Sequence, residues 1–173
     1  CDMLFFGNNI KSITVAEQGN RVVVFDSSRT ARMVEIDSEN RTLSQGRQLP
    51  IRGFANLMPD GEQILGQTSG SELALFDAES GQIHKRLSTG GGSISMAAAT
   101  RDCSGVFYCR SDQLWMNSSA KQYQDDYLLS VCDYQHDLTI SPDGSTVVMV
   151  GGRPTGIYVI DAETGKLIAQ NTP

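Results

Sequence analysis

The sequence repeats itself at a spacing of about 84 residues. A Pro59-Asp60-Gly61 turn precedes the apolar run Leu73–Asp77. The same order returns with Pro142-Asp143-Gly144 and Ile157–Asp161, and each of these runs is followed by Ala-Glu-Ser/Thr-Gly. Self-similarity at a fixed period is the signature of a repeat architecture. This feature constrains the fold more strongly than any single motif in the chain.

The underlying period is about half of that spacing. Asp37 ends an apolar run as Asp77 and Asp161 do, and a diverged copy between the last two has Asn117 at this position. The turn glycines expected before these runs are Gly19, Gly61, Gly105 and Gly144. We therefore predict four repeats within one domain over residues 1–173, with approximate bounds 11–49, 50–88, 89–130 and 131–170.

Each repeat has the pattern of four short strands. Glycine turns separate β-branched runs, because glycine adopts positive φ without a Cβ clash. About sixteen strands in a chain of 173 residues is the spacing of an all-β protein. No segment carries an apolar period of 3.6 residues over a helical length. The sequence predicts an all-β fold of four-stranded antiparallel units, and a repeat of this kind is the unit of a β-propeller blade.

The fourth repeat resembles a known family. Leu138–Gly144, Ile157–Asp161 and Thr164–Leu167 are similar to the bacterial YVTN-type propeller repeat, and Phe54–Leu87 is similar but lacks the Ser before its Pro-Asp-Gly turn. The first and third repeats match only in their strand pattern. The resemblance implies a propeller fold, and it implies no active-site residue, since that family includes both binding modules and enzymes.

Three arrangements of the four predicted blades remain open. In the first arrangement the chain is a fragment of a larger propeller. In the second it closes into a ring of four blades, and in the third it is an open arc that pairs with a partner chain. An arc requires cover for its edges, because unpaired backbone groups on an edge strand are a liability.

Composition favours a globular domain with a protein partner. The net charge is −6, which argues against nucleic acid as a ligand, because phosphate binding needs clustered Lys and Arg. No apolar run approaches the roughly 18 residues of a membrane span. The first third is locally basic, yet acidic residues are interspersed, which favours a solvated mixed surface there. Its arginines are Arg29, Arg32, Arg41, Arg47 and Arg52.

The first residue is Cys1 rather than Met. A mature chain that begins with Cys resembles a bacterial lipoprotein, in which this cysteine carries the lipid. The resemblance implies a periplasmic or other extracytoplasmic location, with a membrane contact only through a lipid on Cys1, and Asp2 is then similar to an inner-membrane retention signal. The alternative is that the sequence starts at an arbitrary point of a longer chain.

Three further cysteines lie in or next to the diverged third repeat. Cys109 and Cys132 fall in two predicted strands and are candidates for a disulfide across the blade. Cys103 with Cys109 is a second candidate pair, and an oxidising compartment favours either bridge. The alternative is that all three are buried thiols.

The search for catalytic chemistry yields no candidate residue. The densest collection of ligand side chains is Cys132, Asp133, His136 and Asp137, and strand alternation sends neighbouring side chains to opposite faces, which disfavours zinc. The sequence contains no nucleophile elbow and no phosphate-binding loop. We predict no catalytic residue, no cofactor and no metal.

The third repeat breaks the pattern, and such departures favour functional positions. It contains the only tryptophan, Trp115, interpreted as a core residue, and a polar segment Ser118–Tyr127 predicted to be a loop. The candidate partner contacts there are Tyr123, Asp125, Asp126 and Tyr127. We predict a noncatalytic module for protein binding or assembly, with a propeller enzyme fragment of lactonase or related hydrolase type, active at its channel mouth, as the alternative.

Overall fold

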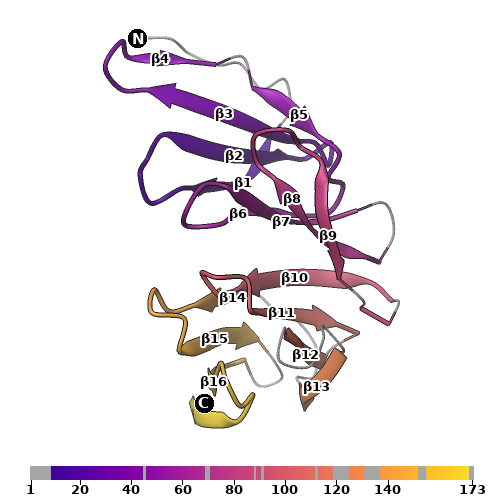
Figure 1. Cartoon of the computed structure of the whole chain (residues 1–173). Coiled ribbons are helices and arrows are strands. Elements are labelled where there is room, and N and C mark those ends of the chain that lie inside the picture. Colours follow the sequence, from indigo (N-terminus) through magenta and orange to yellow (C-terminus); the bar gives the residue numbers. More distant parts are fainter. Residues whose placement is uncertain are drawn as a thin grey trace. The chain divides into compact units, whose positions relative to one another are not determined.

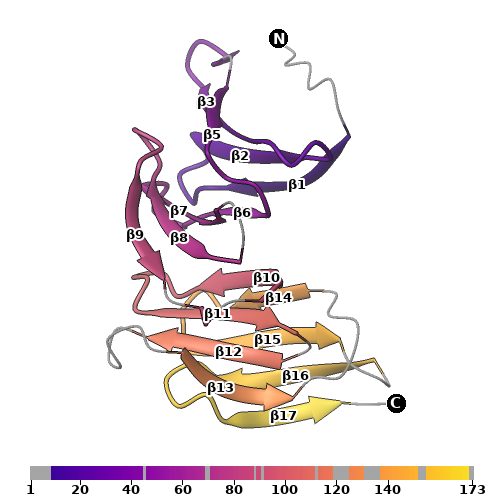
Figure 2. The same cartoon turned by 90° about the vertical axis from the view of Figure 1, so that its right-hand side faces the viewer.

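A computed structural model describes most of the chain. The described residues are 9–44, 46–68, 71–87, 89–90, 92–111, 113–118, 125–130, 137–151 and 155–171, and for 125–130 the backbone alone is described. These residues form seventeen β-strands and no helix (Figures 1 and 2). The chain divides into two compact units, Cys1–Arg86 and Leu87–Pro173. Each unit contains two antiparallel sheets.

The first unit contains the first and second sheets. The first sheet has the order β1-β2-β3-β4, with β5 also pairing with β3. Its strands are β1 (Ile10–Val15), β2 (Arg21–Asp26), β3 (Ala31–Asp37), β4 (Thr42–Leu43) and β5 (Arg47–Leu49). The second sheet has the order β6-β7-β8-β9. Its strands are β6 (Ala55–Leu57), β7 (Gln63–Gln67), β8 (Leu73–Asp77) and β9 (Ile83–Leu87).

The second unit contains the third and fourth sheets, each a four-stranded meander in which every strand pairs with its neighbour in sequence (Figure 2). The third sheet consists of β10 (Ile94–Ala99), β11 (Gly105–Arg110), β12 (Gln113–Ser118) and β13 (Asp125–Ser130). The fourth consists of β14 (Asp137–Ile140), β15 (Thr146–Gly151), β16 (Gly156–Asp161) and β17 (Leu167–Asn171). The predicted all-β class with four-stranded antiparallel sheets is confirmed.

The turn between the first two strands of each sheet is built in the same way. In the fourth sheet Gly144 has φ 74° and its N–H donates to the Ser141 carbonyl over 2.8 Å. Gly19 and Gly61 have the same positive φ and equivalent hydrogen bonds. In the third sheet the position belongs to Cys103, with φ 55° and a bond to the Thr100 carbonyl. The expected turn glycine, Gly105, instead begins β11, so that prediction was wrong by two residues.

The recurring aspartates cap the turn between the last two strands. Asp161 Oδ1 accepts from Thr164 N at 2.7 Å and Thr164 Oγ1 at 2.6 Å. Asp77 makes the same two bonds to Ser80, and Asp37 accepts from the N–H groups of Glu39 and Asn40. Such side-chain to backbone bonds replace the ladder where the chain reverses. The Asp repeat is therefore part of the scaffold.

Two apolar clusters hold the sheets together in pairs. In the first unit, the cluster joins β2, β3 and β5 of the first sheet to β6, β7 and β8 of the second, and includes Phe25, Met33, Ile64 and Phe76. In the second unit, Phe107, Leu114 and Met116 of the third sheet pack with Val147, Met149 and Ile160 of the fourth. Fully burying one such side chain contributes roughly 1.5–3 kcal/mol. Sheet-on-sheet packing thus stabilises each unit.

The diverged third repeat is more regular than predicted. The segment Ser118–Tyr127 was expected to be a loop, but β13 begins at Asp125 and pairs with β12 in the register Asn117↔Asp125 and Trp115↔Tyr127. Trp115 is half-buried, and the Arg110 guanidinium lies 3.9 Å from its ring centroid. Trp115 is therefore a half-buried cation–π partner, where the sequence had suggested a core position.

Candidate functional site

Three of the four predicted partner-contact residues lie on one strand, of which the backbone alone is described. Asp125, Asp126 and Tyr127 lie on β13, whose backbone pairs with β12. Their side chains, and Tyr123 and Cys1 entirely, lie outside the described residues. Partner contact at this strand and lipidation of Cys1 therefore stay predictions.

Cys103 and Cys109 are both buried, and no disulfide is present among the described residues, so the candidate bridges stay predictions. Cys103 occupies a turn, whereas Cys109 on β11 points into the cluster shared with the fourth sheet. There its Sγ lies 3.9 Å from Met149 Sδ. Burial raises the pKa of the Cys109 thiol to about 12, which keeps it protonated and unreactive. Cys132 lies outside the described residues.

The acidic side chains of the described residues act mainly in turns. Within the described ranges, no three His, Cys, Asp or Glu side chains converge closely enough to hold a metal ion. Asp137 accepts a hydrogen bond from its neighbour Leu138 N at 2.9 Å, and Cys132, Asp133 and His136 are not described. Hydrogen bonds from turn hydroxyl and N–H groups lower the pKa values of Asp77, Asp102, Asp143 and Asp161. These carboxylates are thus fixed as acceptors.

The first sheet presents apolar side chains on the face opposite to its core. Strand alternation directs Thr14 toward the second sheet, where its Oγ1 accepts from Leu57 N at 3.0 Å. Ile13 and Val15 point the other way and are 55% and 54% exposed. They pair across the ladder with Val24, which is only 5% exposed, and with the half-buried Val22. We call this set of four side chains the first outer face.

The fourth sheet carries a matching surface. Its core side contains Val147, Met149 and Ile160, so the alternate residues of the same strands form the opposite side. That side pairs Val150 with Ile157 and Val148 with Val159. Ile157 is 46% exposed. We call these four side chains the fourth outer face. Both outer faces consist of Val and Ile, whereas the packed sides of these sheets also contain Phe, Met, Leu and Ala.

A third feature is a groove of about 630 Å³ in the first unit. The β2–β3 turn, the segment from β5 toward β6, Thr68 after β7, and β9 contribute its lining. It contains three arginines, Arg29, Arg52 and Arg86, and no carboxylate side chain among its lining residues. Leu49, Pro50, Ile51 and Ile83 add apolar walls. We call this the basic groove.

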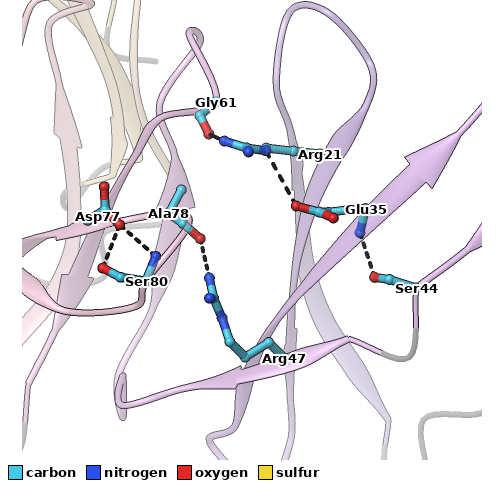
Figure 3. A network of polar contacts seen from close by, with 8 residues as sticks. All are labelled: Arg21, Glu35, Ser44, Arg47, Gly61, Asp77, Ala78 and Ser80. Carbon is cyan, nitrogen blue, oxygen red and sulfur yellow. Dashed lines mark hydrogen bonds and ion pairs between the residues drawn. The ribbon is translucent and has the colours of Figure 1, made fainter.

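The groove arginines differ from the structural arginines of the same unit. Figure 3 shows Arg21 donating to the Gly61 carbonyl at 3.0 Å and contacting Glu35 at 3.8 Å, while Arg47 donates to the Ala78 carbonyl. Those two side chains connect the first sheet to turns of the second. Arg29 and Arg52 are exposed, and among the described residues neither guanidinium forms an ion pair. The sequence identified Arg29 and Arg52 only as parts of a mixed surface and missed Arg86.

Comparison with known proteins identifies the fold. No family model and no curated protein matches the sequence. The β-propeller domain of Cps50 (Swd1) from Myceliophteria thermophila aligns with a TM-score of 0.71 at 14% identity, over 98% of this chain and 56% of that chain. TolB from Acinetobacter baumannii aligns with a TM-score of 0.70 at 17% identity, over 96% of this chain and 44% of that chain. The chain thus has the propeller fold and spans about half the length of these two structures.

Proposed function

We propose that this chain is a noncatalytic β-propeller module that binds other protein chains and assembles with them. We further propose that its repeats are of the bacterial YVTN type. The propeller fold supports the first part, and the Ser141-Pro142-Asp143-Gly144 turn with the strand after it supports the second. The hydrolase alternative predicts a cluster of metal-ligating side chains at a channel mouth, and the described residues contain no group of three His, Cys, Asp or Glu that could hold a metal ion.

The observation that carries the proposal is the pair of outer faces. The first and fourth outer faces consist of Val and Ile side chains, and Ile13, Val15 and Ile157 among them remain about half exposed. Solved propellers that resemble this chain are about twice as long. We infer that the occupant of each outer face is a further propeller sheet, supplied by additional chain or by another molecule.

The proposal also includes an extracytoplasmic location in the bacterial envelope. A lipid on Cys1 is the part of this proposal that an experiment can address. Mass spectrometry of the mature protein from its native membrane tests this part directly, because a diacylglyceryl group on Cys1 adds a defined mass and a bare Cys1 contradicts it.

Self-association of the 173-residue chain tests the outer faces. In isolation, the only sheets available to cover them are those of a second copy, so we expect concentration-dependent association in sedimentation velocity. Ile13→Lys and Ile157→Lys place a charge on the outer faces and should each weaken association about tenfold or more. Gln82→Lys adds the same charge at an exposed turn and should leave association unchanged.

Circular dichroism separates this effect from misfolding, because positions that are about half exposed tolerate lysine. A chain that stays monomeric at 100 μM, on the order of the highest useful concentration, or association that is equally strong in both lysine variants, would contradict the outer-face proposal.

A further inference from the structure

We propose that the basic groove of the first unit binds a carboxylate-bearing peptide segment, with Asp or Glu side chains directed at Arg29 and Arg52. This inference rests on the groove itself and does not depend on the outer faces. Guanidinium groups present planar, forked donors that match carboxylate oxygens, so arginine is favoured over lysine at such sites. All three cations of the groove are arginines.

The groove has the dimensions and chemistry of a ligand site. A volume of about 630 Å³ lies within the range of roughly 300–1,000 Å³ that is usual for small-ligand pockets. The chain as a whole carries a net charge of −6, whereas Arg86 of the groove is paired with Glu72 and Arg29 and Arg52 leave the groove with a local excess of positive charge. Such an excess directs anionic groups to this place on an otherwise acidic molecule.

Hydrogen bonds fix the backbone at the two positions that carry Arg29 and Arg52. Asp26 is buried, and its Oδ1 accepts from Ser28 N at 2.9 Å and Thr30 N at 3.0 Å, which fixes the turn that carries Arg29. The N–H of Arg52 donates to the Gln67 carbonyl at 2.9 Å. Positions fixed in this way reduce the entropy that a partner must overcome when it binds.

Arg86 plays a different part. It pairs with Glu72, whose Oε2 also accepts from Thr68 Oγ1 at 3.2 Å. Because Glu72 occupies the Arg86 guanidinium, the N–H donors of Arg29 and Arg52 are the ones that we assign to a ligand. Apolar walls at Pro50 and Ile83 favour a peptide with aliphatic residues beside its carboxylates over inorganic anions or nucleic acid, since polyphosphate binding draws on charge alone.

Fluorescence anisotropy with a labelled Glu-Leu-Glu-Leu-Glu peptide tests the proposal on the full 173-residue chain. Arg52→Gln and Arg29→Asn should each weaken binding about fivefold, and binding should weaken as ionic strength rises. Arg41→Asn is the matched control, because Arg41 is an exposed arginine with φ 54°, close to the 63° of Arg29, but lies outside the groove. Asn tolerates this conformation at both positions. The control should bind like the wild type.

Several outcomes would overturn the inference. The glutamate peptide would fail to bind, or its Gln-Leu-Gln-Leu-Gln analogue would bind with the same affinity. Alternatively, Arg41→Asn would weaken binding as much as Arg29→Asn and Arg52→Gln do. Stronger binding of inorganic phosphate or of a short single-stranded oligonucleotide would reject the peptide as the ligand class. Retention of self-association in Arg29→Asn and Arg52→Gln would show that the groove acts independently of the outer faces.

Discussion

Gly19→Ala isolates the free energy that the turn conformation alone contributes. Gly19 has φ 70°, and a Cβ built there has no atom within 4 Å. The substitution therefore introduces no clash. An L-residue in the left-handed region costs roughly 1–2 kcal/mol, while alanine recovers about 0.5–1 kcal/mol by restricting the unfolded chain. We expect the free energy of unfolding of the first unit to fall by about 1 kcal/mol.

Urea denaturation followed by far-ultraviolet circular dichroism measures this loss. In thermal unfolding, a loss of about 1 kcal/mol corresponds to a decrease in Tm of roughly 4–8 °C for a unit of this size. Gly81→Ala should give a similar loss, because Gly81 has φ 72° and its added Cβ meets Leu49 Cδ2 at an ordinary 3.5 Å. Ser27→Ala, at an exposed turn position, is the neutral control. An unchanged or more stable Gly19→Ala variant would refute the reasoning, since it would mean that unfolded-state entropy outweighs the turn geometry.

Three further predictions follow from the turns and the core. Arg41→Gly should raise stability by about 0.5–1 kcal/mol in the same assay, because φ is 54° at Arg41. The folded-state pKa values of Asp77 and Asp161 are lowered by their turn hydrogen bonds, so their stabilisation is complete above the unfolded pKa of about 3.9 and is lost as pH falls through the folded values. Asp77→Asn and Asp161→Asn should therefore flatten the acid limb of a stability–pH curve. Cys109 should react with iodoacetamide at pH 8 only on unfolding, and rapid alkylation of the native protein would contradict its burial.

The parts of the fold that depend on local patterns could be predicted from the sequence. The apolar run Ile157–Asp161 lies within β16, and the repeat segment Leu138–Gly144 contains most of β14 and the turn after it. Both segments combine β-branched residues with glycine or Asp turns at their ends. Period-two alternation and positive φ are properties of short segments, so they can be read without knowledge of the tertiary structure.

The turn of the third repeat was misassigned because a glycine was sought. The structure places Cys103 in the left-handed region and keeps Asp102, whose Oδ1 accepts from Ser104 N at 3.0 Å, as Asp143 accepts from Ser145 N at 3.1 Å. In this repeat the aspartate marks the turn where no glycine does, because its hydrogen bond closes the turn whichever residue follows. Aligning the repeats on Asp would have located the turn correctly.

The basic groove could not be predicted from the sequence for a different reason. Arg29, Arg52 and Arg86 lie on a turn, a connecting segment and a strand of two different sheets. No local period links their positions, and of the acidic residues between them in sequence Glu72 pairs with a groove arginine, Arg86. Only the packing of the first sheet against the second brings these side chains around one groove.

The distribution of residues among the repeats separates scaffold from binding site. Asp and Gly recur at the turns because every sheet needs the same chain reversals, and apolar residues recur because every sheet needs a packed side. The groove arginines do not follow this rule: the β11–β12 turn has Ser111 at its positive-φ position, where the β2–β3 turn has Arg29. A charge that the turn does not require, placed in a groove that contains no carboxylate, contributes little to folding. The basic groove is therefore where substitutions should alter binding while leaving the stability of the first unit nearly unchanged.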